Sequence, residues 1–268
     1  MYTPLFSSII EQILQNRLYT IWFLGDSITS AEWIHPNWRE IVEYVLKSEL
    51  DTEIQRRIDE WVLQLNTIYD WQYNPDETVE WYVWRIPSWN VRTLNFGRDG
   101  SSTRDRVAQK EKRLSNHHHI DLLIMIGTCN DPDFNIPVNE TVHNNDIMYA
   151  YCKDVLSIPT VLYATTSYSN YPLRLERYDT YAQKVAEVYA WKEWFFDLWN
   201  HMKQLPVADL ESFYGLQTSG DKIDYTHPNV LGNCYIAGVI LEQYFGIAYN
   251  YKEYYKNIGT MKYLFPWY

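Results

Sequence analysis

An apolar run near the N-terminus constrains the fold of this chain more than any other feature. Residues 19–24 read Tyr-Thr-Ile-Trp-Phe-Leu, and the run ends abruptly at Gly25-Asp26-Ser27. Apolar, β-prone residues that stop at a Gly/Asp/Ser turn predict a buried strand followed by a tight turn. In an open α/β sheet, the carboxyl ends of the strands are where ligands bind. Ser27 is therefore the first candidate functional residue.

A catalytic role for Ser27 depends on a base elsewhere in the chain, because an alcohol must lose its proton to attack. Without a base, Gly-Asp-Ser is ordinary turn chemistry, in which Gly accepts positive φ and Asp and Ser bond their own backbone. Asp224 and His227 provide a base near the other end of the chain. An Asp and a His three residues apart can bond within one turn, so that the carboxylate holds Nδ1–H and leaves Nε2 free for Ser27.

Two further polar turns follow predicted strands, and they turn a weak signal into a predicted site. A glycine-rich turn, Asn95-Phe96-Gly97-Arg98-Asp99-Gly100, follows the second strand, and Gly127-Thr128-Cys129-Asn130-Asp131 follows the third. The backbone N–H of Gly100, near the start of a predicted helix, and the side-chain amide of Asn130 are candidate donors to an oxyanion.

These four blocks resemble those of the SGNH or GDSL hydrolase family. Its marker residues are a Ser in Gly-Asp-Ser, a Gly, an Asn in Gly-x-Asn-Asp and a His in Asp-x-x-His. The resemblance covers roughly residues 21–241. It implies a catalytic triad of Ser27, Asp224 and His227, with an oxyanion hole formed by the N–H groups of Ser27 and Gly100 and the side chain of Asn130.

The third block departs from the family pattern, because two residues rather than one separate Gly127 from Asn130. One interpretation keeps Asn130 in place and displaces Gly127, and this is the one we favour. In the other, the register shifts and Thr128 points into the site. Asp26 and Asp131 are expected to support the site, Asp131 by accepting backbone N–H bonds in its loop.

Alternating strand and helix patterns predict an α/β fold, a three-layer α/β/α sandwich with a mainly parallel five-stranded sheet. The resemblance implies the flavodoxin-like form of this fold. The predicted strands are 19–25, 91–97, 121–126, 159–166 and 206–210. The predicted helices are 9–14, 37–46, 53–62, 101–114, 138–156, 178–202 and 230–245.

We expect one domain, 1–268, with two additions to the family core. An aromatic-rich insertion at about 51–90 is predicted to hold a helix and a hairpin around 79–86. Its aromatic side chains either pack as a satellite core or form a sugar- or acyl-binding wall, and packing is the commoner use. A C-terminal extension at about 246–268 is so rich in Tyr that we expect it to dock on its own domain or on a second subunit, which leaves a homo-oligomer open.

Composition narrows the classes of partner. The net charge of -11 opposes binding to nucleic acid, since that affinity rests largely on neutralising phosphates. No apolar run approaches the ~20 residues of a transmembrane helix. The N-terminus lacks the basic segment and cleavage site of a secretory signal, so we expect a cytoplasmic protein, with a phage particle or a non-standard export route left open.

The cysteines and histidines do not predict a metal site. The three cysteines, Cys129, Cys152 and Cys234, form no C-x-x-C pair, and Cys129 follows a different strand from the Asp-Ser turn. Adjacent histidines at 117–119 point to opposite sides of an extended chain, so a solvated loop is the simpler interpretation. No metal and no cofactor are expected.

The sequence predicts a serine esterase that acts through an acyl-enzyme on short acyl esters, with O-deacetylation of a carbohydrate as the favoured reaction. The substrate is then a small-molecule or carbohydrate ester. A lipase, lysophospholipase or thioesterase of the same family is the first alternative. A binding or structural protein that keeps the fold without turnover is the second, and the complete set of Ser27, Asp224 and His227 argues against it.

Overall fold

The structure, a computed structural model, is that of an α/β/α sandwich. It describes residues 1–15, 17–30, 34, 36–68, 90–114, 119–127, 129–169, 175–216 and 223–261. The predicted hairpin at 79–86, the aromatic residues between 69 and 89, and the chain from 262 onward lie outside the described residues.

A five-stranded parallel sheet forms the middle layer, in the order β2-β1-β3-β4-β5. Its strands are β1 (Tyr19–Gly25), β2 (Val91–Gly97), β3 (Leu122–Ile126), β4 (Thr160–Ala164) and β5 (Phe195–Phe196). This order is that of flavodoxin-like folds, in which the direction of winding reverses beside the first strand. The predicted fold class is confirmed.

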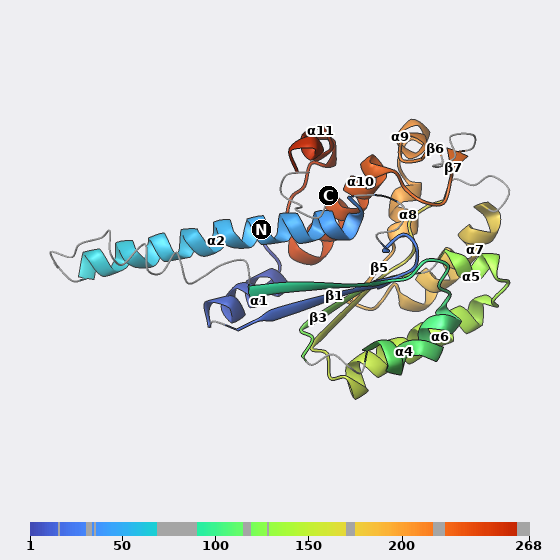
Figure 1. The fold of residues 1–268 in the computed structure, drawn as a ribbon, viewed down its shortest axis with the longest axis horizontal. Helices are drawn as coiled ribbons and strands as arrows, with labels where there is room; N and C mark the ends of the chain where they lie inside the picture. Colours follow the sequence, from blue (N-terminus) through green and yellow to red (C-terminus); the bar gives the residue numbers. More distant parts are fainter. Residues whose placement is uncertain are drawn as a thin grey trace.

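Both faces of the central strands are buried, which explains their continuous apolar sequence. In β1, Ile21 and Phe23 belong to one buried cluster while Trp22 and Leu24 belong to the other, as the alternation of side chains along a strand requires. Figure 1 shows the helices that cover the two faces. On one side lie α1 (Pro4–Leu14), α2 (Trp38–Ile68), α8 (Leu198–Lys203), α10 (Val230–Ile240) and α11 (Tyr251–Met261); on the other lie α4 (Thr103–Leu114), α6 (Val138–Ala150) and much of α7 (Leu175–Tyr189).

Short elements complete the chain around the carboxyl edge of the sheet. They are α5 (Asn130–Asp133), α9 (Val207–Ser212) and the two-stranded antiparallel sheet of β6 (Gly215–Leu216) and β7 (Ile223–Asp224). Single turns of π-helix, η2 (Tyr151–Val155) and η3 (Leu241–Phe245), extend α6 and α10. In the residues that the structure describes, no helix is both long and apolar enough to cross a lipid bilayer.

The fifth strand was predicted at the wrong place. Residues 206–210 lie largely in α9, whose first turn follows Pro206, a residue that fits a helix start. The edge strand is instead β5, which pairs with Tyr163 and Ala164 of β4. The long helix predicted at 178–202 is accordingly wrong in its second half, because α7 ends at Tyr189.

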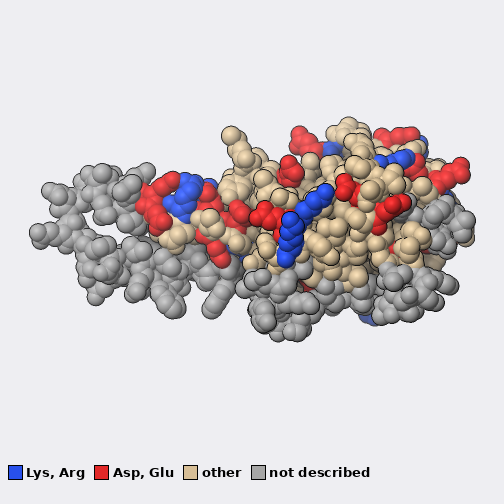
Figure 2. Space-filling view, turned by 90° about the horizontal axis from the view of Figure 1, so that it is seen from above, with Lys and Arg blue, Asp and Glu red and all other residues tan. Residues whose placement is uncertain are grey.

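Helix α2 is about twice as long as strand β1. The predicted helices 37–46 and 53–62 are one helix of 31 residues, about 46 Å, against about 23 Å for the seven residues of β1. Its far half projects beyond the sheet in Figure 1. Figure 2 shows basic side chains among acidic ones on the surface of this projecting part. In α2, Arg56 and Arg57 each form an ion pair with Glu53.

The described part of the C-terminal extension docks on its own domain. Tyr249 lies against Gly238 of α10, where a Cβ would come within 2.4 Å of its ring. Tyr251 and Tyr254 extend this contact, with ring centroids 5.1 Å from Tyr235 and 6.3 Å from Tyr44 respectively. The extension therefore fastens α10 and α2 together from outside.

Candidate active site

Asp26 joins the turns that follow β1 and β3. Its side chain is completely buried, and its two oxygens accept the N–H groups of Ile28 (3.0 Å) and Cys129 (2.8 Å). Backbone N–H bonds from Thr29 and Ser30 to the Asp26 carbonyl close the turn. A carboxylate that accepts backbone N–H groups from two segments fixes both, so the position of Ser27 is tied to the loop that carries Asn130.

Ser27 lies within hydrogen-bond distance of His227. The Ser27 Oγ and His227 Nε2 atoms are 2.9 Å apart, although the residues are 200 positions apart in the chain. Ser27 itself is only 4% exposed. The structure thus brings together the two residues that the sequence placed at opposite ends of the predicted domain.

Asp224 holds the other side of the imidazole. Its Oδ2 lies 2.8 Å from His227 Nδ1, and its Oδ1 accepts the N–H groups of Thr226 and His227, each at 2.9 Å. The pairing of Asp224 with Gly215 in the β6–β7 ladder fixes the start of this turn. Because the carboxylate takes Nδ1–H, the nitrogen that faces Ser27 is the unprotonated Nε2.

The electrostatics of this pair favour an ionised carboxylate. Burial raises the pKa of Asp224, but the hydrogen bond from the His227 ring and the backbone N–H bonds from His227 and Thr226 outweigh it. The pKa of Asp224 therefore lies below its ordinary value. An anion beside Nδ1 stabilises an imidazolium if His227 takes up a proton.

The predicted oxyanion donors lie at neighbouring loops. Gly100 is exposed and adopts φ of +62°, which suits glycine. The Asn130 side-chain amide donates to the carbonyl of Ser101, the residue after Gly100, at 3.0 Å. Within the described chain, the backbone N–H groups of Ser27 and Gly100 donate to no protein atom. Thr128, the alternative donor, lies outside the described residues.

Asp131 braces the loop behind these donors. Its carboxylate accepts hydrogen bonds from the Thr103 backbone N–H (2.8 Å), the Thr103 hydroxyl (2.6 Å) and the Thr141 hydroxyl (2.7 Å). The carboxylate is completely buried and lies at the N-terminus of α4, where a negative charge is favoured. Asp131 thereby connects α5, α4 and α6.

The environment of Cys129 does not favour a reactive thiolate. Burial, with Asp26 nearby, raises its pKa well above the ordinary value, so the thiol stays protonated.

The histidines at 117–119 lie only partly within the described residues. His119 Nε2 lies 3.2 Å from Asp121 Oδ1, and the histidines at 117 and 118 lie outside the described residues. No group of three or more His, Cys, Asp or Glu side chains in the described chain is placed to hold a metal ion.

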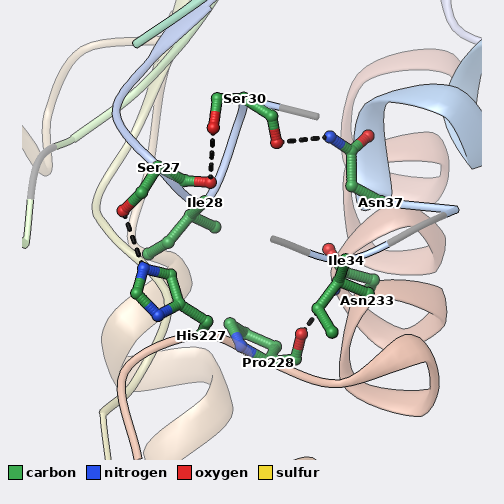
Figure 3. Close-up of a pocket in the computed structure, with 8 residues that line it drawn as sticks. All are labelled: Ser27, Ile28, Ser30, Ile34, Asn37, His227, Pro228 and Asn233. Carbon is green, nitrogen blue, oxygen red and sulfur yellow. Dashed lines mark hydrogen bonds between the residues drawn. The ribbon is translucent and has the colours of Figure 1, made fainter. Parts of the chain in front are cut away.

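A pocket opens beside the Ser27–His227 pair (Figure 3). It encloses about 200 Å³ of empty space, part of it open to solvent. Its lining comes from the Ser27 turn, the start of α2 and the start of α10: Ser27, Ile28, Ser30, Ile34, Asn37, His227, Pro228 and Asn233. Asn37 and Asn233 were not among the predicted site residues. Asn37-x-x-Glu40 is a readable helix-start pattern, whereas nothing marks Asn233 inside an apolar helix.

Comparison with known proteins supports the fold. No family model and no curated protein matches the sequence. Among solved structures, an acetylxylan esterase from Geobacillus stearothermophilus is 16% identical and aligns over 85% of this chain and 94% of its own, with a TM-score of 0.51. A lipase/acylhydrolase from Enterococcus faecalis is 19% identical over 84% of this chain and 95% of its own, with a TM-score of 0.50. The fold expected from the SGNH resemblance is confirmed.

Other structures of the acetylxylan esterase are of catalytic mutants. In these, a serine, an aspartate and a histidine are each replaced by alanine, and the aspartate precedes the histidine by three positions. Asp224 and His227 have the same spacing here.

Proposed function

We propose that this chain is an SGNH-type serine esterase that hydrolyses short-chain acyl esters through an acyl-enzyme. The observation that carries the proposal is the continuous chain of contacts from Ser27 Oγ to His227 Nε2 (2.9 Å) and from His227 Nδ1 to Asp224 Oδ2 (2.8 Å). A nucleophile bonded to a base that is itself oriented by a third group is the signature of nucleophilic catalysis.

Each group then has one role in the reaction. His227 Nε2 accepts the Ser27 proton as Oγ bonds to the ester carbonyl carbon, and it returns the proton to the leaving alcohol as the C–O bond breaks. In the second half, His227 takes a proton from water, the water oxygen attacks the acyl carbon, and Ser27 leaves with the proton. Asp224 holds the ring and stabilises the imidazolium.

The negative charge of each tetrahedral intermediate requires donors. The backbone N–H groups of Ser27 and Gly100, which have no protein acceptor in the described chain, and the Asn130 amide are the groups we assign to it. The bond from the Asn130 amide to the Ser101 carbonyl at 3.0 Å holds this side chain next to the Gly100 loop, which carries the other loop donor.

The substrate class that we propose is a short acyl ester, with an O-acetylated carbohydrate as the favoured substrate. A pocket lined by the Ser27 turn and by the starts of α2 and α10 lies beside Ser27 and His227, so an acyl group can lie next to the nucleophile there. The acetylxylan esterase that shares the fold acts, by its name, on an acetylated sugar polymer. The lipase/acylhydrolase with comparable similarity supports the second candidate, a lipase or thioesterase.

Hydrolysis of p-nitrophenyl acetate and of acetylated xylooligosaccharides tests both parts. We expect release of acetate from both by the wild type, and loss of at least about 10³-fold in kcat for Ser27→Ala. Ser8→Ala is the matched control, because its exposed hydroxyl donates to the Leu5 carbonyl on α1, away from Ser27, and activity should not change. Unchanged turnover in Ser27→Ala would refute the serine mechanism, whereas faster turnover of octanoyl than acetyl esters would favour the second candidate.

A further inference from the structure

The first turn of α2 touches both loops of the candidate active site. Asn37 caps this helix: its Oδ1 accepts the N–H of Glu40 at 3.2 Å, and its own N–H donates to Glu40 Oε2 at 2.9 Å. This reciprocal arrangement is a capping box, and it leaves the Asn37 Nδ2 group available for other acceptors. That group donates to the carbonyls of Thr29 (3.2 Å) and Ser30 (3.0 Å), in the turn that carries Ser27.

Asn233 makes the corresponding contacts on the His227 side. From the first turns of α10, its Nδ2 donates to the carbonyls of Pro228 (2.7 Å) and Asn229 (3.0 Å), directly after His227. Its Oδ1 accepts the N–H of Trp38, the first residue of α2, at 2.9 Å. A helix leaves its first N–H groups without intrahelical partners, so this bond satisfies a group of α2 while it fixes a loop that belongs to α10.

These bonds close a ring around the pocket. From Ser27 the ring passes through its turn to Asn37, and on the other side Asn233 leads back through Pro228 to His227 (Figure 3). The bond from the Trp38 N–H to Asn233 joins the two sides, because Trp38 follows Asn37 in the chain. The Ser27–His227 contact completes it. Both asparagines are 2% exposed, so water does not compete with their hydrogen bonds.

We propose that Asn37 and Asn233 are positioning residues that set the distance between Ser27 Oγ and His227 Nε2, Asn37 through the nucleophile turn and Asn233 through the histidine loop. The inference rests on the proposed function. Neither asparagine has a spare polar group for the substrate, because each side-chain nitrogen donates to two carbonyls and each side-chain oxygen accepts an N–H. Their effect should therefore appear in kcat and not in KM.

Two substitutions remove the loop contacts and keep the helix contacts. Asn233→Asp retains an acceptor for the Trp38 N–H but replaces the donor to Pro228 and Asn229 with an oxygen that their carbonyls repel. Asn37→Ser retains a helix cap and loses the donor to Thr29 and Ser30. Asn145→Asp is the matched control, since Asn145 is also buried but donates to the Tyr163 hydroxyl.

The experiment measures the rate at which a fluorophosphonate labels Ser27, together with kcat and KM for p-nitrophenyl acetate. Because a misplacement of about 1 Å costs on the order of 10²-fold in rate, we expect about 10- to 100-fold slower labelling and lower kcat in both variants, with KM within about threefold. Asn145→Asp should stay within about threefold of wild type. In a His227→Ala background, Asn233→Asp should slow labelling by less than about twofold, because the residue on which it acts is gone.

Labelling of Asn233→Asp at the wild-type rate would overturn the inference, and so would an equal slowing in the His227→Ala background, which indicates a general structural effect. If Asn233→Asp does not fold, Asn37→Ser decides alone: slow labelling supports the inference and wild-type labelling refutes it. A wild-type chain that is labelled at Ser27 while these variants react normally would leave the proposed function standing. A wild-type chain that is not labelled at Ser27 would refute the proposed function first.

Discussion

Gly97→Ala should disable the site through the backbone, without touching any catalytic side chain. Gly97 ends β2 and pairs in register with Gly25, the last residue of β1 before the Ser27 turn. A Cβ on Gly97 would lie 2.4 Å from the Ser30 nitrogen and 2.5 Å from the Thr29 carbonyl carbon. Both are backbone atoms, so no change of rotamer can relieve the contact.

The distances set the size of the effect. Non-bonded heavy atoms prefer separations of about 3.5–4.0 Å, so the new methyl group must move the Ser27 turn or β2 by about 1 Å. Overpacking of this kind lowers the free energy of unfolding by about 1–3 kcal/mol, which a domain with about 5–15 kcal/mol survives. Displacement of the nucleophile by about 1 Å should reduce kcat by on the order of 10²-fold.

Gly215→Ala is the matched control. Gly215, the first residue of β6, also lies next to the site, where it pairs with Asp224. Among the described residues, a Cβ on Gly215 would come no closer than 3.9 Å, to the Asn229 side chain, which is an ordinary contact. We expect its kcat to stay within about threefold of wild type, and urea unfolding to show the loss of stability only in Gly97→Ala. If Gly97→Ala unfolds at the wild-type urea concentration and keeps its kcat, β2 does not lie against the Ser27 turn as described.

Three further predictions concern the site itself. Asn130→Ala should lower kcat for p-nitrophenyl acetate by on the order of 10²- to 10³-fold with a small change in KM, whereas Cys129→Ser should leave kcat nearly unchanged. If Asn130→Ala leaves kcat unchanged and Thr128→Val lowers it, Thr128 and not Asn130 is the donor. Asp224→Asn should lower kcat by about 10⁴-fold, because the imidazole loses the partner that fixes its tautomer, and activity near the wild-type level would contradict that role. Because its folded-state pKa is lowered, the Asp224 carboxylate should contribute stability that is complete above its ordinary pKa of about 4 and is lost as the pH falls through the lower folded value. Urea unfolding of wild type and Asp224→Asn should thus differ by a constant amount from pH 5 upward and converge below about pH 4; a difference that grows with acidity would refute the sign.

The strands of the sheet core were predictable because each is an apolar run closed by a turn. The predictions at 19–25 and 91–97 match β1 and β2, and those for the third and fourth strands differ only at their ends. The edge strand β5 was not predictable in this way, since two residues make no pattern and no Gly or Pro separates it from α7. It is defined by its pairing with β4 and not by its own sequence.

The length of α2 and the ring of hydrogen bonds around the pocket could not be predicted from the sequence. Nothing between 46 and 53 breaks a helix, yet the change from apolar to charged periodicity suggested two helices where the structure has one. Ser27, Asp224 and His227 could be found because their chemistry requires those residue types next to turns. Asn233 could not, because its importance comes from which carbonyls it reaches, and that depends on how α10 packs against α2.

A fluorophosphonate labelling experiment with mass mapping of the adduct tests the central claim most directly, because it examines the nucleophile without requiring the natural substrate. The account predicts one adduct per chain, on the peptide that contains Ser27, formed in the wild type, absent in Ser27→Ala and strongly slowed in His227→Ala. An adduct on another residue, or labelling that persists unchanged in Ser27→Ala, would contradict it.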